Sequence, residues 1–84
     1  MKVTEVRIRR AHAQGRMRAY ASVTLDDQLV IHELRVIDGD NGLFVAMPSR
    51  RGQSGQFRDV AHPVTREARQ MIHEAVISAY EQAV

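Results

Sequence analysis

The 84-residue sequence lacks cysteine and tryptophan, has one lysine, and contains only four aromatic residues, two tyrosines and two phenylalanines. The absence of cysteine excludes disulfide bonds, thiolate zinc sites and a cysteine nucleophile. No apolar run approaches the roughly 18 residues that a membrane span requires. No apolar segment follows Met1–Glu5 in the manner of a signal peptide. We therefore expect a soluble, cytoplasmic protein that makes no membrane contact.

The overall composition is that of a folded chain, with 44% hydrophobic and 26% charged residues. No linker, repeat or low-complexity segment divides it, so residues 1–84 are expected to form a single domain. A domain of this size buries only about 60–65% of the surface of its unfolded chain. Because the core is thin, a homo-oligomer is plausible from size alone.

Positive charge is concentrated in two parts of the chain. Residues 1–18 hold six basic and one acidic side chain, which gives +5, and residues 50–69 hold five basic and two acidic side chains, which gives +3. The other two blocks, 19–49 and 70–84, carry −4 and −2 and bring the total to +2. Eleven of the twelve basic residues are arginine, which binds phosphate bidentately and stacks on bases. A GC-rich genome or a hot-living source explains the same bias without a ligand.

Alternating apolar residues predict an antiparallel sheet. The predicted strands cover residues 3–8, 17–25, 29–37 and 43–47, with a fifth at 57–61 anchored by Phe57 and Val60. Turns are expected at 11–16, 26–28 and 38–42, where Gly, Asp and Asn cluster. Residues 49–56 contain no apolar side chain and are expected to form an exposed loop.

A C-terminal helix is predicted from Arg66 to about Gln82. Apolar residues recur there at helical spacing, and Thr65 is a suitable N-cap. Ile77 falls outside the apolar stripe, which suggests a second contact surface. Strands followed by a helix indicate an α+β fold, with an antiparallel sheet of four to five strands.

No pattern in the sequence requires catalysis, a metal or a cofactor. His32-Glu33 and His73-Glu74 begin like the zinc-protease helix motif, but the second histidine is replaced by Val36 and Ile77. The paired aspartates lie in predicted turns, where such side chains bond their own backbone. So short a chain also leaves little room to enclose a small-molecule substrate. We predict that the protein is not an enzyme.

Three basic groups are candidates for phosphate binding. The first comprises Arg7, Arg9 and Arg10 with Arg16 and Arg18 across the turn, of which all but Arg10 could share one face of the first two strands. The second comprises Arg50, Arg51 and Arg58, and the third comprises Arg66 and Arg69 at the start of the helix, near His73. Each has an ordinary alternative. The strand arginines can pair with Asp26, Asp27 and Glu33, the second group can be a solubilising loop, and the helix arginines can be a solvated face beside Gln70 and Glu74.

The scarcity of aromatic residues argues against a platform that stacks single-stranded bases. Phe44, Phe57 and Tyr80 are expected in the core, which leaves Tyr20. Duplex or structured nucleic acid held by its backbone is the better match.

Several segments closely resemble one known family. MKVTEVRIRR from Met1, GRMRAYASVTLDD from Gly15, IHELRVIDGDNGLFVAMPSRR from Ile31 and FRDVAHPV from Phe57 are similar to the SpoVG family, also called septation proteins. The resemblance covers roughly residues 1–70. It implies a small bacterial cytoplasmic protein with an antiparallel sheet and a C-terminal helix, which dimerises through its sheet. It also implies a DNA- and RNA-binding regulator that influences septation, cell division and sporulation.

The resemblance also implies which residues act. The pair of basic residues in the family's loop corresponds to Arg50 and Arg51. The start of the helix, which varies within the family, corresponds to residues 66–70. The nucleic-acid-binding residues predicted here are Arg50, Arg51, Arg58, Arg66 and Arg69. An alternative is a protein-interaction module, in which an exposed edge strand or the Ile77 face docks a cell-division or regulatory partner without nucleic acid.

Overall fold

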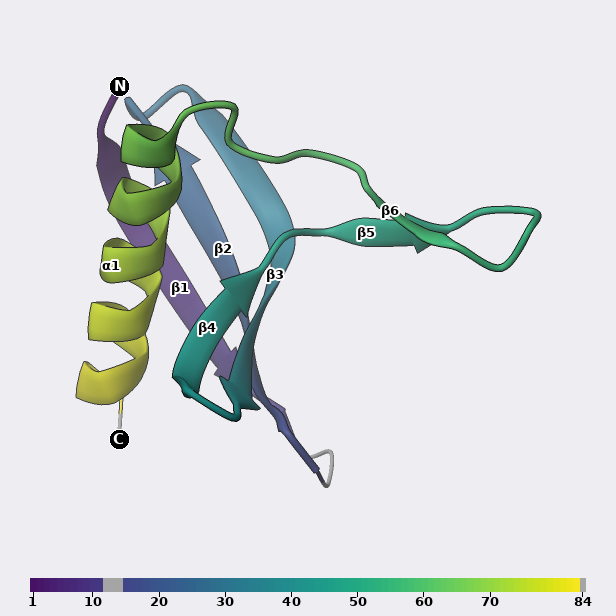
Figure 1. Cartoon of the computed structure of the whole chain (residues 1–84). Coiled ribbons are helices and arrows are strands. Elements are labelled where there is room, and N and C mark those ends of the chain that lie inside the picture. Colours follow the sequence, from purple (N-terminus) through teal and green to yellow (C-terminus); the bar gives the residue numbers. More distant parts are fainter. Residues whose placement is uncertain (12–14, 84) are drawn as a thin grey trace.

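The computed structural model describes residues 1–11 and 15–83, and it has six strands and one helix (Figure 1). The elements are β1 (Val3–Arg10), β2 (Met17–Leu25), β3 (Leu29–Gly39), β4 (Gly42–Ala46), β5 (Ser49–Arg51), β6 (Phe57–Asp59) and α1 (Arg66–Gln82). The predicted α+β class is confirmed. Part of the turn expected at 11–16 lies outside the described residues.

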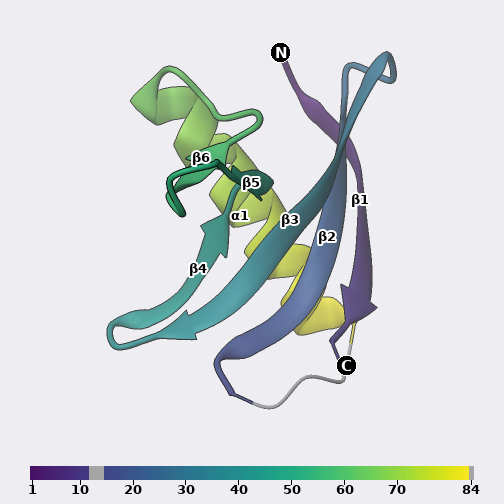
Figure 2. The same cartoon turned by 90° about the vertical axis from the view of Figure 1, so that its right-hand side faces the viewer.

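Strands β1 to β4 form one antiparallel sheet in the order of the chain. The β2–β3 hairpin turns at Asp26 and Asp27, whose φ angles are 53° and 54°. Both residue types tolerate this left-handed conformation, and the turn that it makes matches the twist of the strands. Gln28 N donates to Leu25 O across the turn at 2.9 Å. Helix α1 covers one face of the sheet, and the other face remains open (Figure 2).

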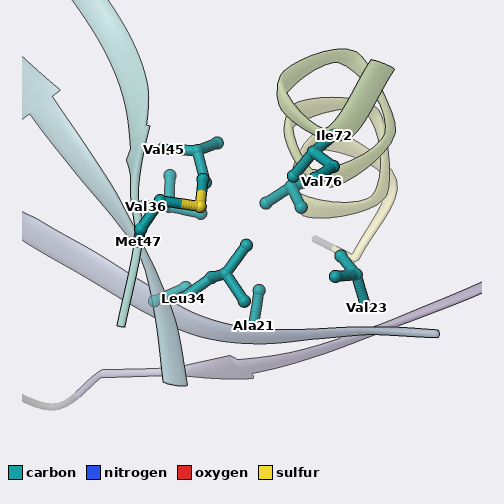
Figure 3. Close-up of a cluster of buried hydrophobic side chains, with 9 residues drawn as sticks. Ala21, Val23, Leu34, Val36, Val45, Met47, Ile72 and Val76 are labelled. Atoms are coloured by element: carbon teal, nitrogen blue, oxygen red, sulfur yellow. The ribbon is translucent and has the colours of Figure 1, made fainter. Parts of the chain in front are cut away.

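The core lies between the sheet and α1 (Figure 3). The predicted alternation in β2 is confirmed, because Ala19, Ala21, Val23 and Leu25 are all buried. Strands β3 and β4 and the segment just after β4 add Leu34, Val36, Val45 and Met47, and the helix adds Ile72 and Val76. Complete burial of a leucine or valine side chain contributes about 1.5–3 kcal/mol. This small set of residues therefore holds the helix on the sheet.

Helix α1 has the bounds that its periodicity predicted. Thr65 is the N-cap, and its Oγ1 accepts a hydrogen bond from Ala68 N at 3.0 Å. Glu67 in the first turn complements the helix dipole. Ile77, which falls outside the apolar stripe of the sequence, is half-buried and packs against the core.

Strands β5 and β6 form a separate two-stranded hairpin that projects from the sheet on the side away from α1 (Figure 1). We call residues 49–59 the arm. The exposed loop predicted at 49–56 is wrong for Ser49–Arg51, which is strand β5. The fifth strand is shorter than predicted and pairs with β5 rather than with the large sheet.

The aromatic residues are also more exposed than expected. Phe57 and Val60 are 71% and 66% exposed, so neither anchors a strand in the core. Phe44 is 44% exposed on β4. Only Tyr80, which is half-buried against the core, lies where it was predicted. Phe57 is exposed because the arm leaves the body of the protein.

Candidate nucleic-acid interface

Two arginines of the arm face each other across its strands. In the β5–β6 register, Arg50 lies directly opposite Arg58, Ser49 opposite Asp59, and Arg51 opposite Phe57. Directly opposed residues of an antiparallel pair share one face, with Cβ atoms about 4.5–5.5 Å apart, and like charges there are destabilising. Both side chains are exposed. An anion bound between the two guanidinium groups would relieve this repulsion.

Arg51 belongs to the opposite face of the arm and lies close to its tip. Arg51 Nη2 is 3.7 Å from the position that a Cβ atom on Gly55 would occupy. Gly55 has a φ of 84°, which favours glycine there. The tip is closed by backbone hydrogen bonds from Gly52 N to Gln56 O at 2.7 Å and from Gly55 N to Gly52 O at 3.1 Å. Arginines therefore occupy both faces of the arm.

The base of the arm is fixed to the large sheet. Arg35 of β3 donates from Nη2 to Met47 O at 3.0 Å and to Ser49 Oγ at 3.2 Å. Val60 N donates to Pro48 O at 2.7 Å and closes the hairpin at its base. Arg35 thus has a positioning role, since it sets the direction in which the arm leaves the sheet.

Among the described residues, Arg7, Arg16 and Arg18 each have a carboxylate partner, whereas the arm arginines have none. The ion pairs among the described residues are Arg7–Glu5 at 3.5 Å, Arg16–Asp40 at 2.8 Å and Arg18–Asp38 at 3.0 Å. The strand arginines were expected to pair with Asp26, Asp27 and Glu33. In the structure three of them pair with Glu5, Asp38 and Asp40 instead. Within residues 1–11 and 15–83, no carboxylate oxygen lies within 4 Å of a basic nitrogen of the arm.

The helix arginines form a second group. Arg66, Arg69, Gln70 and His73 line a shallow groove of about 250 Å³ on the outer side of α1. Gln70 Nε2 donates to Glu74 Oε1 at 2.9 Å. Glu74 is therefore engaged with the amide of Gln70, and neither arginine forms an ion pair with a carboxylate of the described chain.

The five predicted site residues do not converge on one surface of the chain. The arm and α1 lie on opposite sides of the sheet (Figure 1), and no Cα atom of β5 or β6 comes within 8 Å of the helix. Arg50, Arg51 and Arg58 are brought together, and Arg66 and Arg69 stand apart from them. A ligand that meets both groups must reach around the protein or meet two copies of it.

Two members of the first basic group lie together on the open face of the sheet. Arg7 and Arg9 share the open face with Ser22 and Tyr20, their partners across β1 and β2. The Arg9 guanidinium carbon lies 4.5 Å from the centroid of the Tyr20 ring. Sequence reasoning did not include this cluster in the site. The alternation of apolar and polar residues in β1 and β2 places Arg7, Arg9, Tyr20 and Ser22 on the polar faces of their strands. Their contact across the two strands depends on the strand register, which the sequence pattern does not give.

Comparison with known proteins gives the family of the chain. The family model described as SpoVG matches residues 1–82. The chain belongs to the SpoVG family. A SpoVG relative from Listeria monocytogenes serotype 4b (strain F2365), named as septation protein SpoVG 2, is 58% identical over 82 residues, which cover 98% of this chain and 80% of that protein. A relative from Oceanobacillus iheyensis, also named as a septation protein, is 58% identical over 83 residues, covering 99% and 86%.

A third SpoVG relative, from Macrococcus caseolyticus, is 60% identical over 82 residues, with 98% of this chain and 71% of that protein covered. These names describe septation proteins, and none of them names a reaction. In the described part of this SpoVG chain, α1 is neither long nor apolar enough to cross a membrane. The same residues contain no cluster of three or more His, Asp or Glu side chains arranged to hold a metal.

Proposed function

We propose that this SpoVG-family protein is a nucleic-acid-binding regulator, which acts in the cytoplasm as a dimer and contacts DNA or RNA with the arm. The observation that carries the proposal is the pair of directly opposed, exposed arginines, Arg50 and Arg58, neither of which forms an ion pair within residues 1–11 and 15–83. Such a pair weakens the hairpin unless it binds an anion. Arginine binds phosphate well, because two of its N–H groups meet two phosphate oxygens.

The shape of the arm suits this task. A two-stranded ribbon fits within the major groove of a duplex, which is about 12 Å wide. Arg51 on the other face of the ribbon would then meet the second wall of the groove. Arg66 and Arg69 on α1 supply a separate set of phosphate contacts, since a helix start also favours anions.

The incomplete pairing of β3 supports the proposed dimer. Strand β4 pairs only with Arg35–Gly39, so within the described residues the first half of β3 has no partner on that side. Leu29 and Val30 are 59% and 44% exposed there, and a groove of about 780 Å³ lies between them and the base of the arm. An exposed apolar strand edge is a template for pairing with another strand. A second copy joined at this edge would extend the sheet and place two arms on one assembly.

The test is a pair of matched double variants titrated onto duplex DNA and structured RNA. Arg50→Ala/Arg58→Ala removes two arm charges, and Arg16→Ala/Arg18→Ala removes two charges that already have carboxylate partners. The plot of log K against log salt should become shallower by about two for each bound copy of the arm variant, because each lost phosphate contact removes about one. The control should keep the wild-type slope. Equal behaviour of the two variants would refute the assignment to the arm.

A further inference from the structure

The open face of the sheet contains a hollow of about 330 Å³ that is separate from the arm. It is formed by strands β1, β2 and β3, and the side chains that give it its chemistry are Arg7, Arg9, Tyr20, Ser22, His32 and Glu33. The register places Arg7 opposite Ser22 and Arg9 opposite Tyr20. The second irregularity of the β2–β3 pairing, between Ala21 and Val23, brings His32 next to Ser22. Neither the arm nor the helix start contributes to this hollow.

Tyr20 provides a stacking surface within the hollow. Its side chain is half-buried, and the Arg9 guanidinium carbon lies 4.5 Å from the ring centroid. The ring face is thus covered by an exposed and flexible side chain rather than by the core. Aromatic rings on the face of a sheet are a common way to stack unpaired bases. A single ring is enough for a single base, so the scarcity of aromatic residues in the chain does not exclude such a site.

The polar groups around Tyr20 suit the edge of a base better than a run of phosphates. Two arginines, Arg7 and Arg9, are accompanied by two acids, Glu33 in the hollow and Glu5, whose Oε1 lies 3.5 Å from Arg7 Nε. The local charge is therefore nearly balanced, which is unfavourable for tracking a duplex backbone. Base edges carry both donors and acceptors. The hollow offers both, including the hydroxyl of Ser22, which is 2.9 Å from His32 Nδ1.

We propose that this hollow binds one unpaired base of a single-stranded nucleic acid. The base replaces the Arg9 guanidinium on Tyr20, and Arg7 with the displaced Arg9 holds the adjoining phosphate. The proposal rests on the proposed nucleic-acid function and adds a second contact with different chemistry. The arm binds the phosphate backbone of the nucleic acid, and the hollow on the sheet binds an unpaired base. A structured RNA that has both a duplex and a loop could therefore bind to both sites.

The test uses the intrinsic fluorescence of Tyr20. The chain has no tryptophan and two tyrosines, so Tyr80→Phe leaves Tyr20 as the sole fluorophore. This protein is titrated with a short unstructured oligonucleotide at low salt, and separately with a mononucleotide. Stacking of a base on Tyr20 should quench the tyrosine fluorescence when the oligonucleotide is added.

The second measurement is the affinity of variants made in the wild-type background. Tyr20→Ala should weaken oligonucleotide binding roughly 5- to 150-fold, the loss typical of one stacked base. Tyr20→Phe should retain the wild-type affinity for the oligonucleotide, because the aromatic ring remains. Tyr20→Ala should leave the affinity for duplex DNA unchanged.

Absence of quenching, or wild-type oligonucleotide affinity in Tyr20→Ala, would overturn the proposal. A mononucleotide that binds as tightly as the oligonucleotide would overturn the assignment to a single strand. If Tyr20→Ala does not fold, Tyr20→Leu retains apolar bulk without an aromatic face and gives the same comparison. Failure of the arm is recognised separately, since Arg50→Ala/Arg58→Ala would then leave duplex binding intact while quenching at Tyr20 persists.

Discussion

Replacing Arg58 by glutamate should stabilise the arm and weaken nucleic-acid binding at the same time. In the native hairpin, Arg58 lies directly opposite Arg50, and both are positively charged. Arg58→Glu converts this repulsive pair into an attractive one. Cross-strand pairs are worth roughly 0.2–1 kcal/mol, so we expect a gain of about 0.5–1 kcal/mol in the local stability of the arm.

The gain is measured by amide hydrogen exchange at low salt without nucleic acid. The reporters are the amides of Gly52 and Val60, which donate to Gln56 O and Pro48 O at 2.7 Å each. A change of 0.5–1 kcal/mol slows exchange through local opening roughly 2- to 5-fold. At about 1 M salt the Debye length falls to about 3 Å, and the difference from wild type should largely disappear.

The same variant should bind duplex DNA at least ~10-fold more weakly at low salt, because loss of one charge-assisted hydrogen bond costs about 1.5 kcal/mol or more. Arg51→Glu is the matched control, since Arg51 lies opposite Phe57 and not opposite a charge. It should weaken binding without slowing exchange. Unchanged or faster exchange in Arg58→Glu would refute the claim that Arg50 and Arg58 repel each other, and unchanged affinity would refute their role in binding.

Two further predictions concern the core and the open edge of β3. Leu34 is fully buried beneath α1, so Leu34→Ala should lower the free energy of unfolding by about 3 kcal/mol in chemical denaturation; a loss below about 1 kcal/mol would contradict the packing described for it. Val30→Lys places a charge on the exposed edge and should convert a dimer into a monomer in sedimentation equilibrium, as charged edge residues oppose strand pairing. A wild-type protein that is already monomeric would contradict the dimer and favour an edge that is open to a different partner.

Much of the large sheet could be predicted from the sequence because its physical causes are local. Strand β2 alternates strictly between apolar and polar residues over its whole length, and α1 combines a regular apolar stripe with the Thr65 cap. The turn at Asp26 and Asp27 uses residues that accept a positive φ. These signals lie within single segments, so no knowledge of distant contacts was required.

The arm could not be predicted because its structure depends on pairing rather than on pattern. Strand β5 is three residues long and has no apolar side chain, so composition alone indicated a loop. Phe57 was expected in the core since most phenylalanines are buried, but β6 pairs only with β5 and leaves it exposed. The opposition of Arg50 and Arg58 depends on the hairpin register, and the hollow around Tyr20 depends on the irregular β2–β3 pairing.

The most direct test of the central claim is the binding of the wild-type protein to duplex DNA and structured RNA at about 50 and 200 mM salt. The arm and the start of α1 together carry Arg50, Arg51, Arg58, Arg66 and Arg69. If all five contact phosphates, affinity should fall by several hundred-fold to ~10³-fold between the two salt concentrations. Absence of binding at 50 mM, or an affinity that does not change with salt, would contradict the account.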